Sequence, residues 1–378
     1  MTDRLAEQLA FLVEVDRLKR VDRPNVLMDG SRFENAAEHS WHLALWAMIF
    51  ADAAPEDTDL DRALMMCLLH DLVEIDGTEQ SPDEATSVER LFALLPADQG
   101  ASFHAVWTEF AEGKSPEARY VRMLDTLQPA FQELFNPDQT ERDREILRHL
   151  LTIGRAALMR DDWPEAHDYA MSLLDRKGVS PPQPFGARLR FLAEADRLKT
   201  VLRGTTIFDG SRRENSAEHS WHLALYAIVL GEHSVTDSDP ARALKMLILH
   251  DLVEIDAGDA PVHGNHDPAL QEAKEQAAAD RLFGMLPEDQ GTNLRALWDE
   301  FEAAASDDAI FAKSVDRVQP VMANLECGGG SWIEYDVTID RLEARVASKI
   351  RLGLPAVWEA LRPAVEDWFS PEGKAPAE

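Results

Sequence analysis

Hydrophobic residues recur along most of the chain at the three- and four-residue spacing of amphipathic helices, and few stretches alternate as strands do. The first helix is expected at residues 3–21, where leucines return on one face before Pro24 interrupts the pattern. A second helix should start near Asn35. The same spacing predicts later helices near residues 60–75, 84–95, 101–112 and 115–135, and a pair within 140–176. The pattern therefore predicts an all-α fold.

This series of helices is present twice. The string DGSRFENAAEHSWH at residues 29–42 returns as DGSRRENSAEHSWH at 209–222, and LLHDLVEID at 68–76 returns as ILHDLVEID at 248–256. Both repeats lie 180 positions apart, whereas later helices match at an offset of 191. The second copy therefore carries eleven additional residues within 260–276, and it also has a glycine-rich segment at 328–332.

A proline-rich segment separates the two copies. Three prolines at positions 181, 182 and 184 cannot continue a helix and favour a semi-rigid spacer. We expect an N-terminal domain at 1–176, a linker at 177–186 and a C-terminal domain at 187–378. A chain of 378 residues is long enough for two separate cores.

Composition limits the partners that the protein can bind. The formal net charge of −31 argues against nucleic acid and against an anionic membrane, because few cationic side chains are left to neutralise phosphates. Two cysteines at unrelated positions do not suggest disulfides, and no apolar run approaches the length of a membrane span. The first helix contains acidic residues and does not resemble a signal peptide. A cytoplasmic protein is expected.

The candidate chemistry lies in the repeated histidines and acids. A His-Asp doublet within an apolar helix is costly to bury without partners, and Glu74 follows close enough to share its side of the helix. A single doublet is usually a hydrogen-bonded core pair. Two matched doublets, each with another histidine before it and an aspartate after it, favour a divalent cation. Nitrogen and oxygen ligands together suit Mn, Co, Fe, Ni or Zn better than Ca.

These motifs resemble the HD-domain metal-dependent phosphohydrolases, and in detail the 5′-deoxynucleotidase-like branch. The resemblance rests on Arg-Leu-Lys before the first turn, Arg-x-Glu-Asn-x-x-Glu-His, and His-Asp-x-x-Glu with an acid five residues later. It covers nearly all of each copy and implies two helical bundles, each with one metal ion. Because family members commonly form homodimers, it also implies that the two copies pack as an intramolecular pseudo-dimer. A homo-oligomer of the whole chain is compatible with the same resemblance.

The resemblance also implies roles for individual residues. The implied metal ligands are His39, His70, Asp71 and Asp125 in the first copy, and His219, His250, Asp251 and Asp316 in the second. The implied catalytic acids, which orient or deprotonate the attacking water, are Glu74, Glu254 and Asp259, with Glu79 at the position equivalent to Asp259. The implied phosphate-binding residues are Arg23 and Arg203, with Arg32 and Arg212 as second candidates.

The sequence departs from the family at one position. The deoxynucleotidases place a tryptophan directly after the phosphate-binding arginine, where it helps exclude the ribose hydroxyl. Here the residue is Pro24 or Gly204. The expected substrate is a small phosphomonoester, with a nucleoside or deoxynucleoside 5′-monophosphate favoured and the choice of sugar left open.

Two other functions compete with this interpretation. In one, the metal only stabilises a non-catalytic helical scaffold or regulatory module. In the other, the fold carries a di-iron oxygenase, for which only His263 and His266 of the second copy could supply extra ligands. Because the second copy keeps the Glu–Asp spacing and the longer segment after it, we expect that copy to hold the active site.

Overall fold

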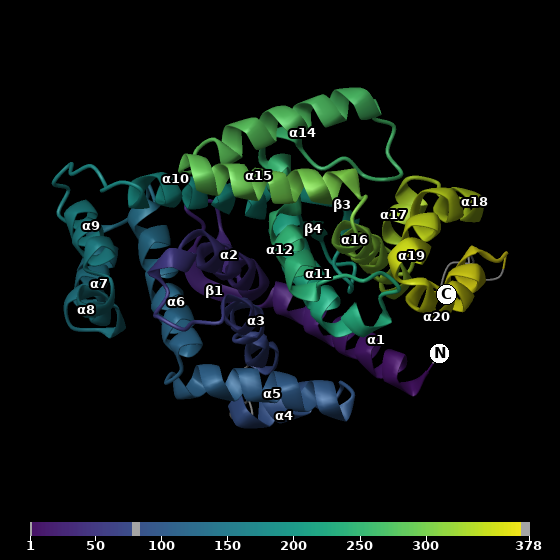
Figure 1. Ribbon diagram of the computed structural model, residues 1–378, viewed down its shortest axis with the longest axis horizontal. Coiled ribbons are helices and arrows are strands. Elements are labelled where there is room, and N and C mark those ends of the chain that lie inside the picture. The colour runs from purple at the N-terminus through teal and green to yellow at the C-terminus, as the bar shows by residue number, and fades with distance from the viewer. Residues whose placement is uncertain (1, 78–83, 372–378) are drawn as a thin grey trace.

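The computed structural model describes residues 2–77 and 84–371, and the two copies share the order of their elements from the opening helix to the 3₁₀ turn at the His-Asp doublet (Figure 1). The first half contains α1 (Asp3–Val15), η1 (Asp16–Arg20), β1 (Asp22–Val26), β2 (Phe33–Asn35), α2 (Ala36–Ile49), η2 (Ala51–Ala53), α3 (Leu60–Leu69), η3 (Leu72–Asp76), α4 (Glu84–Phe92), α5 (Ala97–Glu112), α6 (Pro116–Phe135), α7 (Glu141–Thr152), η4 (Arg155–Leu158), α8 (Met159–Asp162) and α9 (Pro164–Leu174).

The second half begins after the proline-rich segment. It contains α10 (Phe185–Ala195), η5 (Asp196–Thr200), β3 (Leu202–Thr206), β4 (Arg213–Asn215), α11 (Ser216–Leu230), η6 (Gly231–His233), α12 (Pro240–Leu249), η7 (His250–Val253), α13 (Glu254–Ala257), α14 (Pro268–Phe283), α15 (Glu288–Ala303), α16 (Asp307–Glu326), α17 (Gly330–Glu334), α18 (Ile339–Leu342), η8 (Glu343–Ala347), α19 (Ser348–Gly353) and α20 (Pro355–Phe369). The all-α prediction is confirmed.

The helix predicted at 60–75 is shorter than expected, which corrects the sequence interpretation. The α-helix α3 ends at Leu69, and the chain continues through the 3₁₀ turn η3. The helix predicted at 3–21 also changes to the 3₁₀ turn η1 after Val15. In both places the change of pitch occurs next to buried polar residues, so hydrophobic spacing alone could not locate it.

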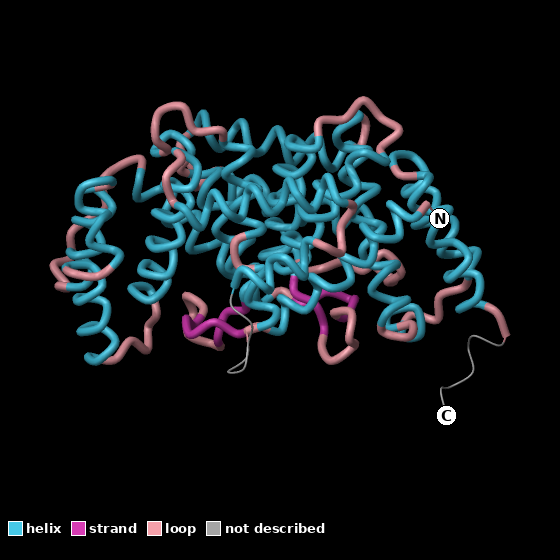
Figure 2. The backbone as a smooth tube through the Cα atoms, turned by 90° about the horizontal axis from the view of Figure 1, so that it is seen from below, coloured by secondary structure: helices cyan, strands magenta, loops and turns pink. Residues whose placement is uncertain are grey.

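Two small antiparallel hairpins, β1–β2 and β3–β4, were not predicted. They are short and carry charged residues and a proline, so they lack the alternation that identifies a strand. In Figure 2 both hairpins lie on the same side of the molecule. Each hairpin leads directly into a central helix, so it fixes where that helix begins.

The central helices α2 and α11 pack against each other at the interface between the halves. Their apolar side chains occupy all faces, and nearly every residue of both helices is buried. Each begins with a capping box, formed by Asn35 with Glu38 and by Asn215 with Glu218. The first helix of each half packs on the central helix of the other, α1 on α11 and α10 on α2 (Figure 1).

Contacts across this interface are reciprocal. Asn35 Nδ2 donates to Glu218 Oε2 at 2.8 Å, and Asn215 Nδ2 donates to Glu38 Oε1 at 2.5 Å. The indole of Trp41 donates to the carbonyl of Ile248, as Trp221 does to that of Leu68. Such exchange of equivalent contacts is the pattern of an isologous dimer interface, here formed within one chain.

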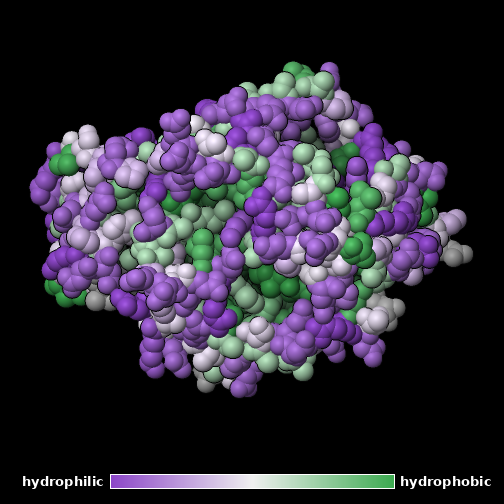
Figure 3. Space-filling view, in the orientation of Figure 1, coloured by the Kyte–Doolittle hydropathy of each residue, from purple (hydrophilic) through white to green (hydrophobic). Residues whose placement is uncertain are grey.

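The face of the molecule drawn in Figure 3 is mostly hydrophilic, as the acidic composition predicts. Figure 3 shows hydrophobic residues of this face gathered mainly in recesses near its centre. Within residues 2–77 and 84–371, no helix has the length and apolar character needed to cross a membrane.

Candidate active site

Four residues of the second half that are far apart in sequence meet in one buried cluster. His219 lies on α11, His250 and Asp251 lie on η7, and Asp316 lies on α16. His219 Nε2 is 3.4 Å from Asp316 Oδ1, and His250 Nε2 is 3.0 Å from Asp251 Oδ1. Ligand atoms of the two histidines and Asp316 all lie within 4.8 Å of one another. The cluster has the donor atoms and the spacing of a cation site.

The first half repeats this cluster. His39 Nε2 lies 3.1 Å from Asp125 Oδ1, and His70 Nε2 lies 3.2 Å from Asp71 Oδ1. His39 and Asp71 are also close, with 3.9 Å between Nε2 and Oδ2. The structure thus brings together the four residues in each half that the family resemblance nominates as ligands.

Backbone hydrogen bonds orient one histidine of each cluster for a cation. His250 Nδ1 donates to the carbonyl of Leu247 at 2.8 Å, and His70 Nδ1 donates to that of Cys67 at 2.9 Å. Each Nε2 atom then faces the carboxylates, is buried, and makes no hydrogen bond within the part of the chain that the structure describes. Because an unsatisfied buried nitrogen is costly, these atoms fit a divalent cation.

The cluster's aspartates are held ionised. Burial would raise the pKa of Asp316, but Arg317, His219 and His250 outweigh burial and keep that pKa well below its usual value. For Asp251, burial is likewise outweighed by His250 and Arg203, and its pKa falls to about 2. Both side chains are therefore carboxylates at neutral pH, the form that binds a metal.

Glu254 lies beside the cluster in a different state. Burial, with repulsion from Asp251, raises the pKa of Glu254 well above its usual value, although Arg203 opposes the shift. Ser216 Oγ donates to Glu254 Oε2 at 2.5 Å, while Oε1 lies 3.6 Å from Arg203 Nη1. A carboxyl group with a raised pKa and one oxygen beyond hydrogen-bond distance of Arg203 is suited to accept and release a proton.

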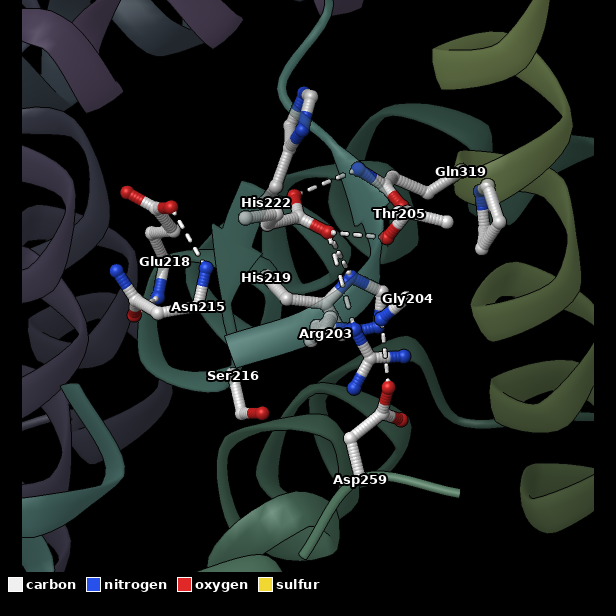
Figure 4. Close-up of polar contacts among 12 residues, drawn as sticks. Arg203, Gly204, Thr205, Asn215, Ser216, Glu218, His219, His222, Asp259 and Gln319 are labelled. Atoms are coloured by element: carbon white, nitrogen blue, oxygen red, sulfur yellow. Dashed lines mark hydrogen bonds and ion pairs between the residues drawn. The ribbon is translucent and has the colours of Figure 1, made fainter. Parts of the chain in front are cut away.

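Arg203 and Asp259 complete this side of the site (Figure 4). Arg203 Nη1 donates to Asp251 Oδ2 at 2.5 Å. Asp259 Oδ2 accepts the backbone N–H of Gly204 at 2.7 Å. A Cβ atom at position 204 would lie 2.8 Å from Pro261 Cγ and 3.3 Å from the Tyr335 hydroxyl. Pro261 and Tyr335 thus occupy the space that a larger residue at position 204 would need.

These groups face a cavity of about 200 Å³ in the second half. His250, Asp251, Glu254, Asp259, Arg203 and Asp316 line one part of its wall. The rest of the wall includes Arg317, Asn324, Ser331, Trp332 and Tyr335. The cavity therefore joins a candidate cation site to a space with cationic, amide and aromatic surfaces.

The equivalent groups of the first half are more open. The Glu74 side chain is 39% exposed, whereas that of Glu254 is 11% exposed. Arg23 donates to Asp71, as Arg203 does to Asp251. Position 36 is alanine, so Glu74 lacks the hydroxyl that Ser216 offers to Glu254. Glu79, the counterpart of Asp259, lies outside the described residues.

Two predicted substrate-binding residues are not brought to the cavity. Arg32 and Arg212 form paired ion contacts with Glu38 and Glu218 at the interface between the halves. Each also donates to a backbone carbonyl of the other half, at Lys199 and Lys19 respectively. Their contacts identify them as interface residues, and we do not propose that they bind the substrate.

Two extra histidines also fail to form a second cation site. Among the described residues, four groups have the spacing to hold a cation, and none includes His263 or His266. His263 lines the cavity, and its carbonyl accepts from Arg341, while its buried Nδ1 atom makes no hydrogen bond among the described residues. The di-iron arrangement thus gains no support from the geometry.

Sequence reasoning missed the residues that support the histidines from behind. Glu214 Oε2 accepts from His219 Nδ1 at 3.0 Å, and Gln319 donates to the other carboxylate oxygen at 2.8 Å (Figure 4). Burial would raise the pKa of Glu214, but Lys19 and His219 hold it well below its usual value. The signal was available, because this glutamate occurs in both copies of the Arg-x-Glu-Asn string.

Comparisons with known proteins identify relatives of each half of the chain. The family model described as "HD domain" matches residues 15–166 and again residues 195–358. The 5′-deoxynucleotidase HDDC2 of Mus musculus is 27% identical over 135 residues, which cover 35% of this chain and 66% of that protein. Its Homo sapiens counterpart is 28% identical over 140 residues, covering 36% and 67%. The chain thus spans about two thirds of the length of these relatives.

A solved structure is also similar in sequence. The predicted metal-dependent phosphohydrolase from Magnetospirillum magnetotacticum MS-1 is 42% identical to this chain. The match covers 48% of this chain and 94% of that one, with a TM-score of 0.46.

Proposed function

The chain belongs to the HD-domain family, and from that membership we propose that it is a metal-dependent phosphohydrolase whose active site lies in its second half. The observation that carries the proposal is the cavity in which the His250–Asp251 pair, Glu254 and Arg203 face one another. The relatives named 5′-deoxynucleotidase support the reaction class. We further propose a nucleoside 5′-monophosphate as substrate.

The proposed cation ligands are His219, His250, Asp251 and Asp316, with the equivalent set in the first half. A divalent transition metal bound by these residues would supply Lewis-acid chemistry, which polarises a phosphoryl oxygen and acidifies water. Mn, Co, Fe, Ni and Zn all accept this mixture of nitrogen and oxygen donors. One ion per half is the proposed content.

The protein's own side chains would carry the proton and orient the phosphate. Glu254 Oε1 is free to take a proton from the attacking water, because Ser216 already holds Oε2. Arg203 presents its guanidinium on the same side of the cavity, where a phosphate oxygen can replace part of its contact with Asp251. Asp259 fixes the backbone next to Arg203 through the Gly204 N–H.

The rest of the cavity suits a nucleoside. Trp332 and Tyr335 offer aromatic surface, and Asn324 and Ser331 offer amide and hydroxyl groups for a base or sugar. Gly204 stands where the family's deoxynucleotidases have a tryptophan, and Pro261 and Tyr335 fill the space beside it. We therefore propose that ribo- and deoxyribonucleotides are hydrolysed at comparable rates.

Two further differences favour the second half. At the offset of 191 residues, Arg317 corresponds to Thr126, and Asn324 corresponds to Glu133. The first half thus replaces a cation with a neutral residue and an amide with an acid. Both changes weaken attraction for a phosphorylated substrate, in addition to the greater exposure of Glu74.

Glu254→Gln tests this proposal directly. The substitution keeps the shape of the side chain but removes its capacity to accept a proton, so hydrolysis should fall by about 100-fold or more. Metal content, measured by elemental analysis, should stay unchanged. Glu74→Gln is the matched control and should leave most of the activity. If wild-type protein with bound metal hydrolyses nothing in a broad phosphoester panel, the non-catalytic scaffold becomes the better account.

A further inference from the structure

A buried lysine of the first half is bonded to a glutamate of the second. Lys19 Nζ donates to Glu214 Oε1 at 2.7 Å, contacts His222 Nδ1 at 2.9 Å, and also donates to Asp16. Lys19 and Glu214 are both fully buried. A buried lysine with two carboxylates has no role in an ordinary apolar interface, because such charges are costly to desolvate.

The same glutamate reaches the candidate metal site through its other oxygen. Glu214 Oε2 accepts from His219 Nδ1 at 3.0 Å, and Thr205 Oγ1 donates to that oxygen at 3.3 Å (Figure 4). Gln319 Nε2 donates to Oε1 at 2.8 Å. With Nδ1 donating its proton to Glu214, the lone pair of His219 lies on Nε2, 3.4 Å from Asp316.

The first half shows a related arrangement. Lys199 Nζ donates to Glu34 Oε1 at 2.6 Å and to Asp196 Oδ1 at 2.5 Å. His39 Nδ1, however, lies 3.6 Å from Glu34 Oε2 and instead contacts Gln128 Oε1 at 3.1 Å. The acceptor behind the histidine is therefore a carboxylate in the second half and an amide oxygen in the first.

The interface clusters are not themselves additional cation sites. Asp16, Glu214 and His222 have the spacing of a metal-binding group, as do Glu34, His42 and Asp196. In each group a lysine ammonium already lies within hydrogen-bond distance of the carboxylates and the histidine. The lysine supplies the positive charge that these groups require.

We propose that Glu214 is a positioning residue for His219, and that Lys19 of the other half holds Glu214 in that position. The first half then completes the metal site of the second through Lys19–Glu214, whereas in the reverse direction Lys199–Glu34 stops 3.6 Å short of His39, whose nearer acceptor is Gln128. The inference deepens the proposed function, since His219 is one of the proposed ligands.

The experiment measures Co²⁺ affinity at one site at a time in the full-length chain. His70→Ala silences the first site, so titration by Co²⁺ visible absorption reports the second; His250→Ala does the reverse. Glu214→Gln keeps the side-chain shape but weakens the acceptor, and should lower affinity at the second site by about 10- to 100-fold. Glu34→Gln should have a smaller effect at the first site, where Gln128 is the nearer acceptor.

Lys19→Met gives the decisive comparison, because a purely structural role would affect both sites. We expect weaker Co²⁺ binding at the second site with the first site unchanged. Lys199→Met should have only a small effect at the first site, because the nearer acceptor of His39 is Gln128. Because Lys19→Met leaves Asp16 without its partner, Lys19→Met/Asp16→Asn is the fallback variant if the single change prevents folding. Circular dichroism checks the fold in every case.

Three results would overturn the proposal: unchanged affinity in Glu214→Gln, equal loss at both sites in Lys19→Met, or loss confined to the first site. Failure of the proposed function looks different. In that case wild-type protein binds Co²⁺ with the expected cross-dependence but hydrolyses no phosphoester, and the positioning role stands.

Discussion

At the scale of single residues, position 216 distinguishes the two copies next to the proposed base. Ser216 donates to Glu254 Oε2, whereas Ala36 leaves Glu74 without that bond. Ser216→Ala should lower kcat by about tenfold, the equivalent of one hydrogen bond to a charged group. KM for the nucleotide should change little, because the Ser216 hydroxyl contacts the Glu254 side chain and not the substrate.

Steady-state kinetics of Ser216→Ala beside Ala36→Ser separates this role from a general effect. The second substitution gives the first copy the missing hydroxyl and should not alter total activity by itself, since Glu74 stays exposed. Wild-type kcat in Ser216→Ala would show that the hydroxyl has no part in orienting Glu254.

Residues such as His250 and Asp251 could be nominated from sequence because each appears twice in the same surroundings. The supporting pair Lys19–Glu214 could not, because its members are 195 positions apart and belong to different copies. Arg32 and Arg212 show the opposite case. The family resemblance made them second candidates for phosphate binding, and only the packing of the halves assigns both to the interface.

At the scale of elements, the start of α11 combines a helix cap with an interface contact. Asn215 Oδ1 accepts from the backbone of Glu218, while its Nδ2 donates to Glu38 of the other half. Asn215→Ala should lower the free energy of unfolding by about 2 to 4 kcal/mol, the sum of a lost cap and a lost bond to a carboxylate.

The matched control for the cap is Thr140→Ala. Thr140 forms a capping box with Asp143 at the start of α7, on an exposed part of the first half. Its loss should cost only about 1 kcal/mol. Chemical denaturation of both variants measures the difference; equal losses would mean that the contact between Asn215 and Glu38 adds nothing.

The segment around His263, which has no counterpart in the first copy, should make stability depend on pH. Burial, with Arg341, Arg345 and Arg317, lowers the pKa of His263 to about 4 from an ordinary value of 6.5. The unfolded chain therefore binds a proton between these pH values that the folded chain does not. Stability from this group is complete above pH 6.5 and is lost as the pH falls toward 4.

Urea denaturation of wild type and His263→Gln at several pH values tests this expectation. On acidification to about pH 4, the unfolding free energy should fall by about 2 kcal/mol less in the variant than in wild type. An identical pH dependence in both proteins would mean that His263 is not protected from protonation in the folded state.

Helix positions were largely predictable because hydrophobic spacing determines them, but local changes of pitch were not. The α-helix ends after Leu69, and His70 and Asp71 then face residues from other helices. The position of this break depends on those residues, so the segment's own sequence does not reveal it. The hairpins before α2 and α11 depend in the same way on partners outside their own sequence.

At the scale of the whole molecule, the duplication produces two clusters of equal composition in unequal surroundings. The two halves make equivalent contacts through their central helices, through the first helix of each half and through reciprocal hydrogen bonds. Additional residues after the second His-Asp pair and the glycine-rich segment at 328–332 line the cavity of the second half. The first half has a cavity of about 410 Å³ beside Asp125, but His70, Asp71 and Glu74 do not line it. Repetition in the sequence predicted the shared part, and the differences became interpretable once packing was known.

The most direct test of the central claim is phosphate release from ribo- and deoxyribonucleoside 5′-monophosphates with Mn²⁺ or Co²⁺. Wild type should be compared with His250→Ala and His70→Ala. We predict that His250→Ala lowers kcat/KM by about 100-fold or more and that His70→Ala keeps most of the wild-type rate. Loss of activity in His70→Ala with retention in His250→Ala would contradict the assignment of the active site to the second half.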